Sequence, residues 1–337
     1  MSFCSRHSMN KKIYILLLLA FLFLITTFLV ALCLGTSNIG PLKLASLFCN
    51  SNTEDTLYRI IVHVRLPRVL GALLAGCALS VSGAIIQSVL NNPLAGPNII
   101  GINSGAGFAM LLAAILLPFH PALIPVFAFI GAMFAALIII IISVSTNASR
   151  LTIVLIGFAI SSILTAGINT IMIFYPDAYI GASTFIIGGL SSLTMQKIVF
   201  PALYIASGLI LAVIFSRDLN ILSLGTNTAK SLGMNVTFTK TFMIGISAIL
   251  AGAAVSFAGL LGFVGLIVPH AVRYLVSNDN KIVIPVSCLV GGGFLIVCDT
   301  VSRILFAPYE LPVGILMAFV GAPLFIFLIM KNRHAKY

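Results

Sequence analysis

The sequence predicts an all-α polytopic membrane protein of about ten transmembrane helices, arranged as two inverted five-helix halves. Three observations predict this fold: the composition, the length of the apolar segments and an internal repeat. Of the 337 residues, 60% are hydrophobic and only 7% are charged, whereas a soluble domain carries roughly 25% charged residues. Such a chain does not have enough polar side chains to cover a water-facing surface.

Ten continuous apolar segments account for most of the chain. A helix of about 20 residues crosses the hydrocarbon core of a bilayer, and most of these segments approach or exceed that length. Their continuity is unlike the residue-by-residue alternation of a membrane β-barrel. The expected spans are residues 13–34, 62–88, 101–117, 122–144, 151–174, 197–215, 239–258, 260–276, 282–306 and 312–330.

The internal repeat predicts how these spans are arranged. Residues 72–83 and 248–259 carry the same residue at seven positions, at a constant separation of 176 residues. Repeats of this kind are typical of duplicated transporters. Because five spans, an odd number, separate the two copies, the second half is inverted relative to the first. We therefore expect one transmembrane domain over 1–337, with halves 13–196 and 197–337.

The orientation follows from the basic residues. If the N-terminal residues 1–12 lie in the cytoplasm, 12 of the 18 Lys and Arg residues fall on the cytoplasmic side, as the positive-inside rule requires. Both termini are then expected to be cytoplasmic, with the chain embedded in the lipid bilayer of a bacterial cytoplasmic membrane. A nucleic-acid partner is not expected, because it needs a basic face that water can reach.

Small residues recur at every fourth position in both repeat copies: Gly76 and Ser80 in the first, Gly252 and Ser256 in the second. Residues four apart share a helix face, so each copy offers a smooth stripe that another helix can approach closely. Two interpretations are open. The stripes pack helices within one subunit, or they flank a translocation path.

A proline follows each stripe: Pro93, directly after Asn92, and Pro269. Proline interrupts the helical hydrogen-bond ladder, and at membrane depth such a break is tolerated only where protein or a water-filled cavity covers it. Corresponding breaks in two halves point to a transport path. We therefore expect the stretches 91–97 and 262–270 to be broken and to lie near that path.

No catalytic constellation is recognisable in the sequence. The seven acidic residues are scattered, the five histidines are far apart, and no phosphate-binding loop occurs. We therefore predict no catalytic residue, no cofactor site and no metal site, and no span is expected to hold a buried acid. If transport is active, its energy is expected to enter from another polypeptide.

A docking point for such a polypeptide is expected on the cytoplasmic side, in the segment 217–238. Thr226 is suited to cap a short helix there, and Gly233 is suited to end it. An undirected loop is the alternative. The apolar positions that the segment offers to a partner are Leu222, Ala229 and Leu232.

Eight spaced motifs run from about residue 40 to the C-terminus. They are Arg65-Leu66-Pro67-Arg68, the small-residue run to Gly83, Asn92-Pro93-Leu94-Ala95, Leu222-Ser223-Leu224-Gly225, Ser231-Leu232-Gly233, residues 262–270, Glu310-Leu311-Pro312-Val313-Gly314 and Gly321-Ala322-Pro323. In type and order they resemble the FecCD-type permeases, which are the membrane subunits of ABC importers for iron chelates, haem and cobalamin.

The resemblance implies a non-catalytic subunit that forms a homodimer, or a heterodimer with a paralogous permease, around a central path. It also implies ABC ATPase subunits on the cytoplasmic side and an extracellular substrate-binding protein or lipoprotein. In the family, a coupling helix after the sixth span contacts the ATPase. That role maps onto Leu222, Ser223, Leu224, Gly225, Thr226, Ala229, Leu232 and Gly233. The chain departs from the family at Thr226 and Asn227, where members often carry acids.

Family permeases also use outward arginines to receive acidic residues of the binding protein. The matching positions are Arg65, Arg68 and Arg303. Arginine suits this role because its planar fork binds a carboxylate in a bidentate manner. The alternatives are interfacial snorkelling and an internal Arg303–Asp299 pair at helical i, i+4 spacing.

The expected function is the import of an iron(III)–siderophore or a related metal chelate. Haem and cobalamin are alternatives within the family, because specificity resides largely in the binding protein. An ATP-independent secondary transporter is a further alternative. The coupling segment and the expected lack of membrane carboxylates argue against it.

Overall fold

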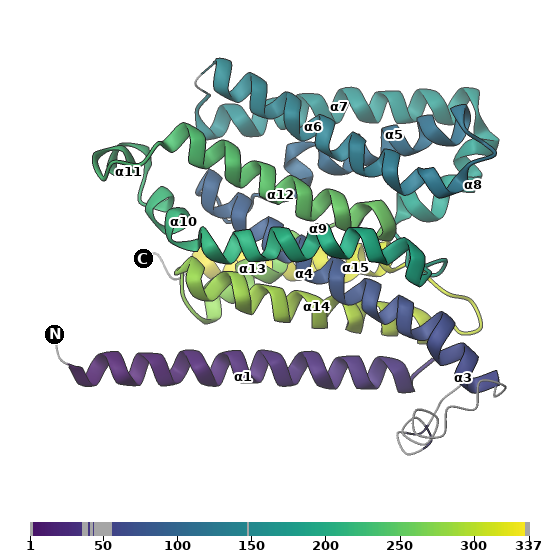
Figure 1. Cartoon of the computed structure of the whole chain (residues 1–337), viewed down its shortest axis with the longest axis horizontal. Helices are drawn as coiled ribbons and strands as arrows, with labels where there is room; N and C mark the ends of the chain where they lie inside the picture. The colour runs from purple at the N-terminus through teal and green to yellow at the C-terminus, as the bar shows by residue number, and fades with distance from the viewer. Residues whose placement is uncertain (1–2, 36–39, 41–42, 44–55, 147, 334–337) are drawn as a thin grey trace.

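Long helices that run along a common axis make up the molecule (Figure 1). The computed structural model describes residues 3–35, 40, 43, 56–146 and 148–333, and no strand occurs among them. The longer helices are α1 (Phe3–Cys33), α4 (Leu66–Leu90), α5 (Ile102–Leu116), α6 (Ile124–Ser145), α7 (Arg150–Phe174), α9 (Met195–Ile214), α12 (Val236–Ala258), α14 (Asn280–Ile304) and α15 (Val313–Arg333). The shorter ones are α3 (Thr56–Ile60), α8 (Pro176–Ile187), α10 (Ser216–Ser223), α11 (Thr226–Ser231) and α13 (Val264–Leu275).

The all-α fold class and the expected number of spans are confirmed. Seven helical segments are long and apolar enough to cross a membrane, and three shorter apolar helices lie in α5, α13 and α15. A π-helical turn, Ile61–Arg65, joins α3 to α4, so that these form one span. The additional helix α8 was not predicted. It begins at Pro176, and proline is favoured in the first turn of a helix.

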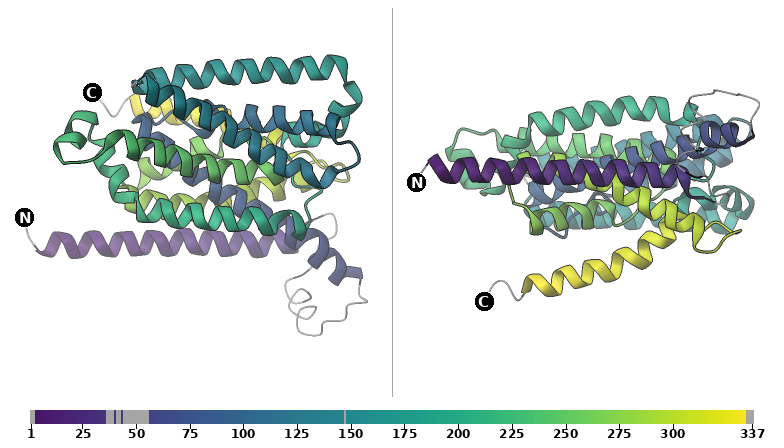
Figure 2. Two further views of the ribbon diagram at one scale, coloured as in Figure 1. Left: turned by 45° about the horizontal axis from the view of Figure 1, so that its top comes forward. Right: turned by 90° about the horizontal axis from the view of Figure 1, so that it is seen from below.

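Three helices form the centre of the bundle. The spans that contain α4, α12 and α14 bury 83%, 78% and 61% of their most apolar window, whereas those of α1 and α7 bury 22% and 17%. The outer helices therefore present apolar side chains to the surroundings, as helices in contact with lipid do. Figure 2 shows α1 on the outside of the bundle, and its right-hand view shows α15 on the outside as well.

The two ends of the bundle carry different features. One end, called here the coupling end, carries α10 and α11, and both termini of the described chain lie there (Figure 1). The opposite end, called here the arginine end, carries Arg65, Arg68 and Arg303, at the start of α4 and the end of α14. Termini on one side of the bundle are what an even number of spans produces.

The two copies of the internal repeat lie on α4 and α12, which pack against each other. The hydroxyl oxygens of Ser82 and Ser247 are 2.7 Å apart. Gly71, near the start of α4, lies against the ring of Phe257, near the end of α12. The residue numbers of α4 increase in the direction in which those of α12 decrease, so the two helices are antiparallel. An inverted repeat requires this relationship between its copies.

The small residues of the first copy pack against α14. A Cβ atom on Gly76 would overlap the carbonyl oxygen of Gly291. One turn further along, the Ser80 hydroxyl donates to the Ser287 carbonyl at 2.7 Å. The backbones of α4 and α14 therefore approach each other so closely that only small residues fit between them.

The small residues of the second copy are buried as well. Gly252 faces the Ala132 methyl group of α6, which would lie 3.1 Å from an added Cβ. The Ser256 hydroxyl donates to the Ala253 carbonyl at 2.8 Å, and Ser256 is buried. The contact of Gly252 with α6 is one of helix packing, the first of the two interpretations of the stripes, whereas the Ser256 bond stays within α12. A role along a translocation path stays a prediction.

The first predicted break lies at the coupling end, where α4 ends in a turn. Asn91 adopts a left-handed backbone with φ 47°. The side-chain oxygen of Asn92 then accepts a hydrogen bond from the Leu94 N–H at 2.9 Å, and Pro93 is exposed in this turn. The helix is therefore interrupted within 91–97, as predicted.

The second break lies earlier in the chain than predicted. α12 ends before Gly259, at φ 75°, and α13 begins after Phe263, at φ 64°. Pro269 lies inside α13 and is buried, so the prediction that it interrupts the helix was wrong. Proline removes only the one hydrogen bond that residue 269 would donate to the Gly265 carbonyl. That carbonyl lies against Gly83 of α4, where a Cβ atom would overlap it.

Candidate functional site

Buried charged side chains gather at the arginine end. The Nε of Arg68 donates to both carboxylate oxygens of Asp299, at 3.0 and 3.1 Å, and its Nη1 lies 2.6 Å from a Glu310 oxygen. The Nε of Arg303 lies 3.3 Å from Oδ2 of the same aspartate. The Asp299 side chain is only 1% exposed. One buried carboxylate thus pairs with two guanidinium groups, from α4 and from α14.

The arginines also hold the end of α1. The Nη1 of Arg65 donates to the carbonyls of Leu32 at 2.8 Å and Cys33 at 3.1 Å. The Nη2 of Arg303 donates to the Ala31 carbonyl at 3.3 Å. The last carbonyls of a helix lack intrahelical partners and carry partial negative charge. Arg65 and Arg303 therefore cap α1 and dock it onto the central helices.

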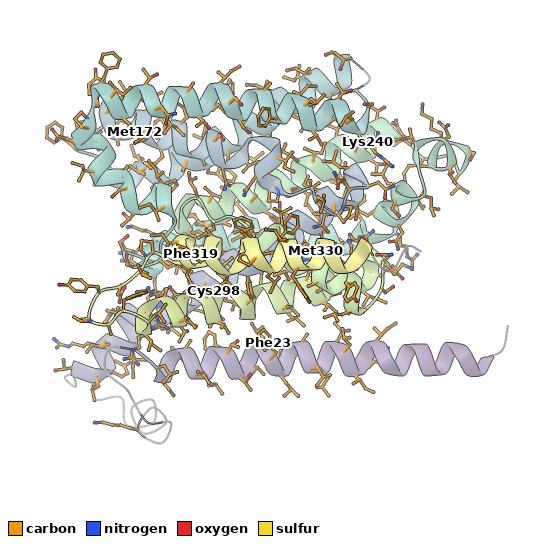
Figure 3. The ribbon with its side chains drawn as sticks, turned by 180° about the vertical axis from the view of Figure 1, so that it is seen from behind. Phe23, Met172, Lys240, Cys298, Phe319 and Met330 are labelled. Atoms are coloured by element: carbon orange, nitrogen blue, oxygen red, sulfur yellow. The ribbon has the colours of Figure 1, made fainter. Side chains whose placement is uncertain are left out.

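The three arginines lie at the end of the bundle opposite the coupling segment, but their side chains are buried within the chain. Arg65, Arg68 and Arg303 are 4%, 6% and 4% exposed. The internal Arg303–Asp299 pair, offered by the spacing as an alternative, is present. The expectation that no span holds a buried acid is wrong, because Asp299 lies within α14; its neighbour Cys298 marks this part of the helix in Figure 3. The docking role of the arginines stays a prediction.

The predicted coupling segment forms α10 and α11, which extend beyond the bundle at the opposite end (Figure 1). Gly225, at φ 114°, is the N-cap of α11, so Thr226 is its first residue and not its cap. Gly233 follows the helix at φ 81°, and its N–H bonds the Lys230 carbonyl at 2.9 Å. The prediction that Gly233 ends this helix is confirmed.

Two of the apolar positions expected to face a partner point inward instead. Leu222 and Ala229 are fully buried, whereas Leu232 is 62% exposed. Leu224, which sequence reasoning did not include among the apolar contacts, is 64% exposed. Leu222 lies one helical turn after the buried Leu219, so the same face of α10 carries both toward the bundle. The large exposed apolar side chains of the segment 217–238 are therefore Leu224 and Leu232, beside α11, and Phe238 at the start of α12.

A hydrogen-bond network connects α10 to the central helices. The Asn220 amide donates to Asp279 Oδ1 at 2.6 Å, and its oxygen accepts from the backbone N–H of Asn280 at 2.8 Å and from its side chain at 2.9 Å. On the other side of the segment, Arg150 of α7 donates to the Leu222 carbonyl at 3.0 Å. The position of α10 is thus tied to α14 and α7.

The network continues from α14 into α4 and α13. The side-chain oxygen of Asn280 accepts from the Ser88 hydroxyl at 2.8 Å and from Arg273 at 2.8 Å. Arg273 also donates to Ser88 Oγ at 2.7 Å. Asn280 is fully buried, and hydrogen bonds between buried polar groups favour one arrangement of the helices that carry them. We call Ser88, Asn220, Arg273 and Asn280 the amide relay.

Sequence reasoning did not identify the amide relay. In the sequence, each member of the amide relay is a single polar residue near the end of an apolar segment. The end of any helix shows the same pattern. The members come from positions as distant as residues 88 and 280, which only the tertiary structure brings together. Among the described residues, no group of three or more His, Cys, Asp and Glu side chains forms a metal-binding arrangement.

Comparison with known proteins extends over nearly the whole chain. The model of the FecCD transport family matches residues 22–331. The hemin transport system permease protein HmuU of Yersinia pestis is 36% identical over 336 residues, which cover 97% of this chain and 99% of that protein. The Fe(3+)-citrate import system permease protein YfmD of Bacillus subtilis is 34% identical over 332 residues, 98% of each.

Structural comparison agrees with the sequence similarity. A solved structure described as an inward-facing conformation of a metal-chelate type ABC transporter has a TM-score of 0.82 at 28% identity. The match covers 94% of this chain and 98% of that one. The family model, the relatives and the fold therefore agree. The chain belongs to the FecCD transport family.

Proposed function

We propose that this chain is the membrane-spanning permease of an ATP-driven importer that carries an iron(III)–siderophore or a related metal chelate across the cytoplasmic membrane. The observation that carries the proposal is the full-length similarity to permeases named for hemin and Fe(3+)-citrate transport. ATP is hydrolysed on separate ATPase subunits. The chain itself forms the path and changes its access from one side to the other.

The coupling end supports this division of labour. Leu224 and Leu232 form an exposed apolar contact for an ATPase on a segment that the described spans do not cover. A displacement of α10 is transmitted by Asn220 and Asn280 to α14 and, through Ser88, to α4. These two helices lie at the centre of the bundle, so a small displacement of α10 also displaces the helices that pack around α4 and α14.

The working unit is a dimer, formed with a second copy or with a paralogous permease. Membership of the permease family supports it. The exposed apolar face of α7, with Phe158 at 69% and Ile163 at 72% exposure, is the candidate interface. Both termini lie in the cytoplasm together with α10 and α11, because the basic residues predict that side. Cysteine pairs placed on α7 would crosslink in membranes if this helix meets its counterpart, and they would stay monomeric if it faces only lipid.

The binding protein docks at the arginine end. Glu310 supports this assignment, because it belongs to the charged cluster and its side chain is 36% exposed, so a partner can reach it. A direct role of Arg65, Arg68 and Arg303 is tested by reversing each charge. Stimulation of ATP hydrolysis by the loaded binding protein should be lost while the ATPase subunits remain bound. Full stimulation in a folded variant would rule the role out.

Reconstitution tests the proposed function as a whole. The chain is placed in proteoliposomes with its cognate ATPase and binding protein, and labelled ferric siderophore, haem and cobalamin are offered separately. Uptake of one chelate should require ATP and be inhibited by vanadate. Uptake that follows an ion gradient without ATP would show a secondary transporter. ATP-dependent uptake of haem or cobalamin alone would replace the siderophore assignment.

A further inference from the structure

A pocket of about 520 Å³ opens at the coupling end, where α6 meets α7 and where α11 meets α12. Its wall contains three basic side chains, Arg150, Lys230 and Lys240, and no acidic one. Figure 3 shows Lys240 at this end of the bundle, near α11. Like charges in one cavity repel each other, so this arrangement is favourable only beside a compensating anion.

The three cations lack acidic partners in the part of the chain that the structure describes. The ion pairs there lie at the arginine end, between Arg68, Arg303, Asp299 and Glu310. Arg150 uses one terminal nitrogen to bond the Leu222 carbonyl, but its Nε is buried and has no acceptor. Buried donors without an acceptor are rare, and each needs an explanation.

Two helix starts add to the positive potential. α7 begins at Arg150 and α12 begins at Val236, and both residues line the pocket. The N-terminus of a helix carries partial positive charge and favours anions, phosphate above all. Thr237 and Thr241 of α12 add hydroxyl donors to the same wall. The polar part of the pocket is therefore complementary to a phosphate group.

The remaining wall is apolar and continues onto the outer surface of the spans. Val144 at the end of α6 is 43% exposed, and Leu151 at the start of α7 is 70% exposed. A free inorganic anion gains nothing from these side chains, but a hydrocarbon chain attached to the anion does. The pocket also lies where the apolar helices end, which is the depth of lipid head groups.

We propose that this pocket binds the phosphate of an anionic phospholipid. The phosphate lies between Arg150, Lys230 and Lys240, and the acyl chains run along Val144 and Leu151. The site adjoins α11, so a bound lipid steadies the base of the coupling segment. This assignment does not depend on which chelate the protein transports.

Binding of phosphatidylglycerol to the full chain in mild detergent tests the proposal. The wild type should bind phosphatidylglycerol more tightly than phosphatidylcholine. The double variant Lys230→Gln/Lys240→Gln should bind phosphatidylglycerol about 30-fold more weakly, which corresponds to about 1 kcal/mol per charge. This variant leaves the bond between Arg150 and Leu222 in place, so the fold is not at risk.

The matched control is Arg217→Gln/Lys281→Gln, which removes two exposed charges at the same end but outside the pocket. It should leave binding within about twofold of the wild type. Equal losses in both double variants would show a diffuse charge effect and overturn the site. Equal affinity for the two lipids would overturn it too. If inorganic phosphate alone binds as tightly as the lipid, the lipid assignment is wrong.

Discussion

The Nε of Arg68 lies 3.0 Å from a carboxylate oxygen of Asp299, although 231 residues separate the two in the chain. This pair joins α4 to α14 at the arginine end, and Ser88 and Asn280 join the same helices at the coupling end. Between these points, Gly76 and Gly291 bring the backbones into contact. We infer that α4 and α14 move as one unit between the two ends of the protein.

Removing the central carboxylate should destabilise the protein strongly. Asp299→Asn leaves Arg303 buried without its acidic partner and leaves Arg68 with Glu310 alone. Breaking a buried pair in this way costs about 3–5 kcal/mol. The apparent unfolding temperature in detergent should fall by several degrees. Asp177→Asn changes an exposed acid on α8 and should leave that temperature nearly unchanged. Equal stability of the two variants would contradict a bracing role for the pair.

A methyl group at residue 83 should be incompatible with the native packing. Gly83→Ala places a Cβ on the Gly265 carbonyl oxygen, so α13 must move away from α4. Overpacking of a close contact costs about 1–3 kcal/mol and occasionally more. The yield of folded protein in size-exclusion chromatography should drop sharply. Gly245→Ala is the matched control, because nothing lies within 4 Å of its added Cβ, and it should be tolerated.

The amide relay should affect coupling more than stability. Asn220→Ala removes the bonds from α10 to Asp279 and Asn280. ATP hydrolysis in the assembled importer should persist while chelate uptake per ATP falls, because α10 no longer moves α14. In a double-mutant cycle on the free energy of unfolding, Asn220→Ala and Asn280→Ala should show an interaction energy of about 0.5–3 kcal/mol. Additive effects, or unchanged uptake per ATP, would argue against transmission through this contact.

Asn278→Ala is the control for the relay. Asn278 is exposed two residues before Asn280, and only its backbone carbonyl bonds another residue, Arg273. Uptake per ATP in this variant should match the wild type. A loss equal to that of Asn220→Ala would show that any change near the start of α14 disturbs coupling.

The exposed leucines of the coupling segment should determine ATPase binding. The double variant Leu224→Ala/Leu232→Ala removes two apolar contacts worth about 1.5 kcal/mol each when buried. The ATPase should then bind about a hundredfold more weakly in a pull-down titration. Leu155→Ala/Leu203→Ala removes equally exposed leucines from α7 and α9 and should not change this affinity. Unchanged binding in the first variant would place the ATPase contact elsewhere.

Much of the fold was predictable because it depends on local patterns. Apolar length predicts α6, α7 and α14 to within a few residues, and Gly233 marks a helix end whose left-handed backbone glycine adopts without strain. A short helix within the segment 217–238 was predicted, and α11 confirms it. The position of Pro269 within α13 was not predictable, because its cost depends on what lies beside the Gly265 carbonyl.

The sequence by itself determined the fold class, the number of spans, the side on which the termini lie relative to each other, and the family. These follow from hydrophobicity and motif order along the chain. The tertiary structure alone decided that Arg68 and Arg303 both pair with Asp299, and that Leu222 faces the bundle while Leu224 does not. The physical reason is that burial of a charge or a leucine depends on which helix packs beside it. Local periodicity gives a helix its faces but does not say which neighbour covers each one.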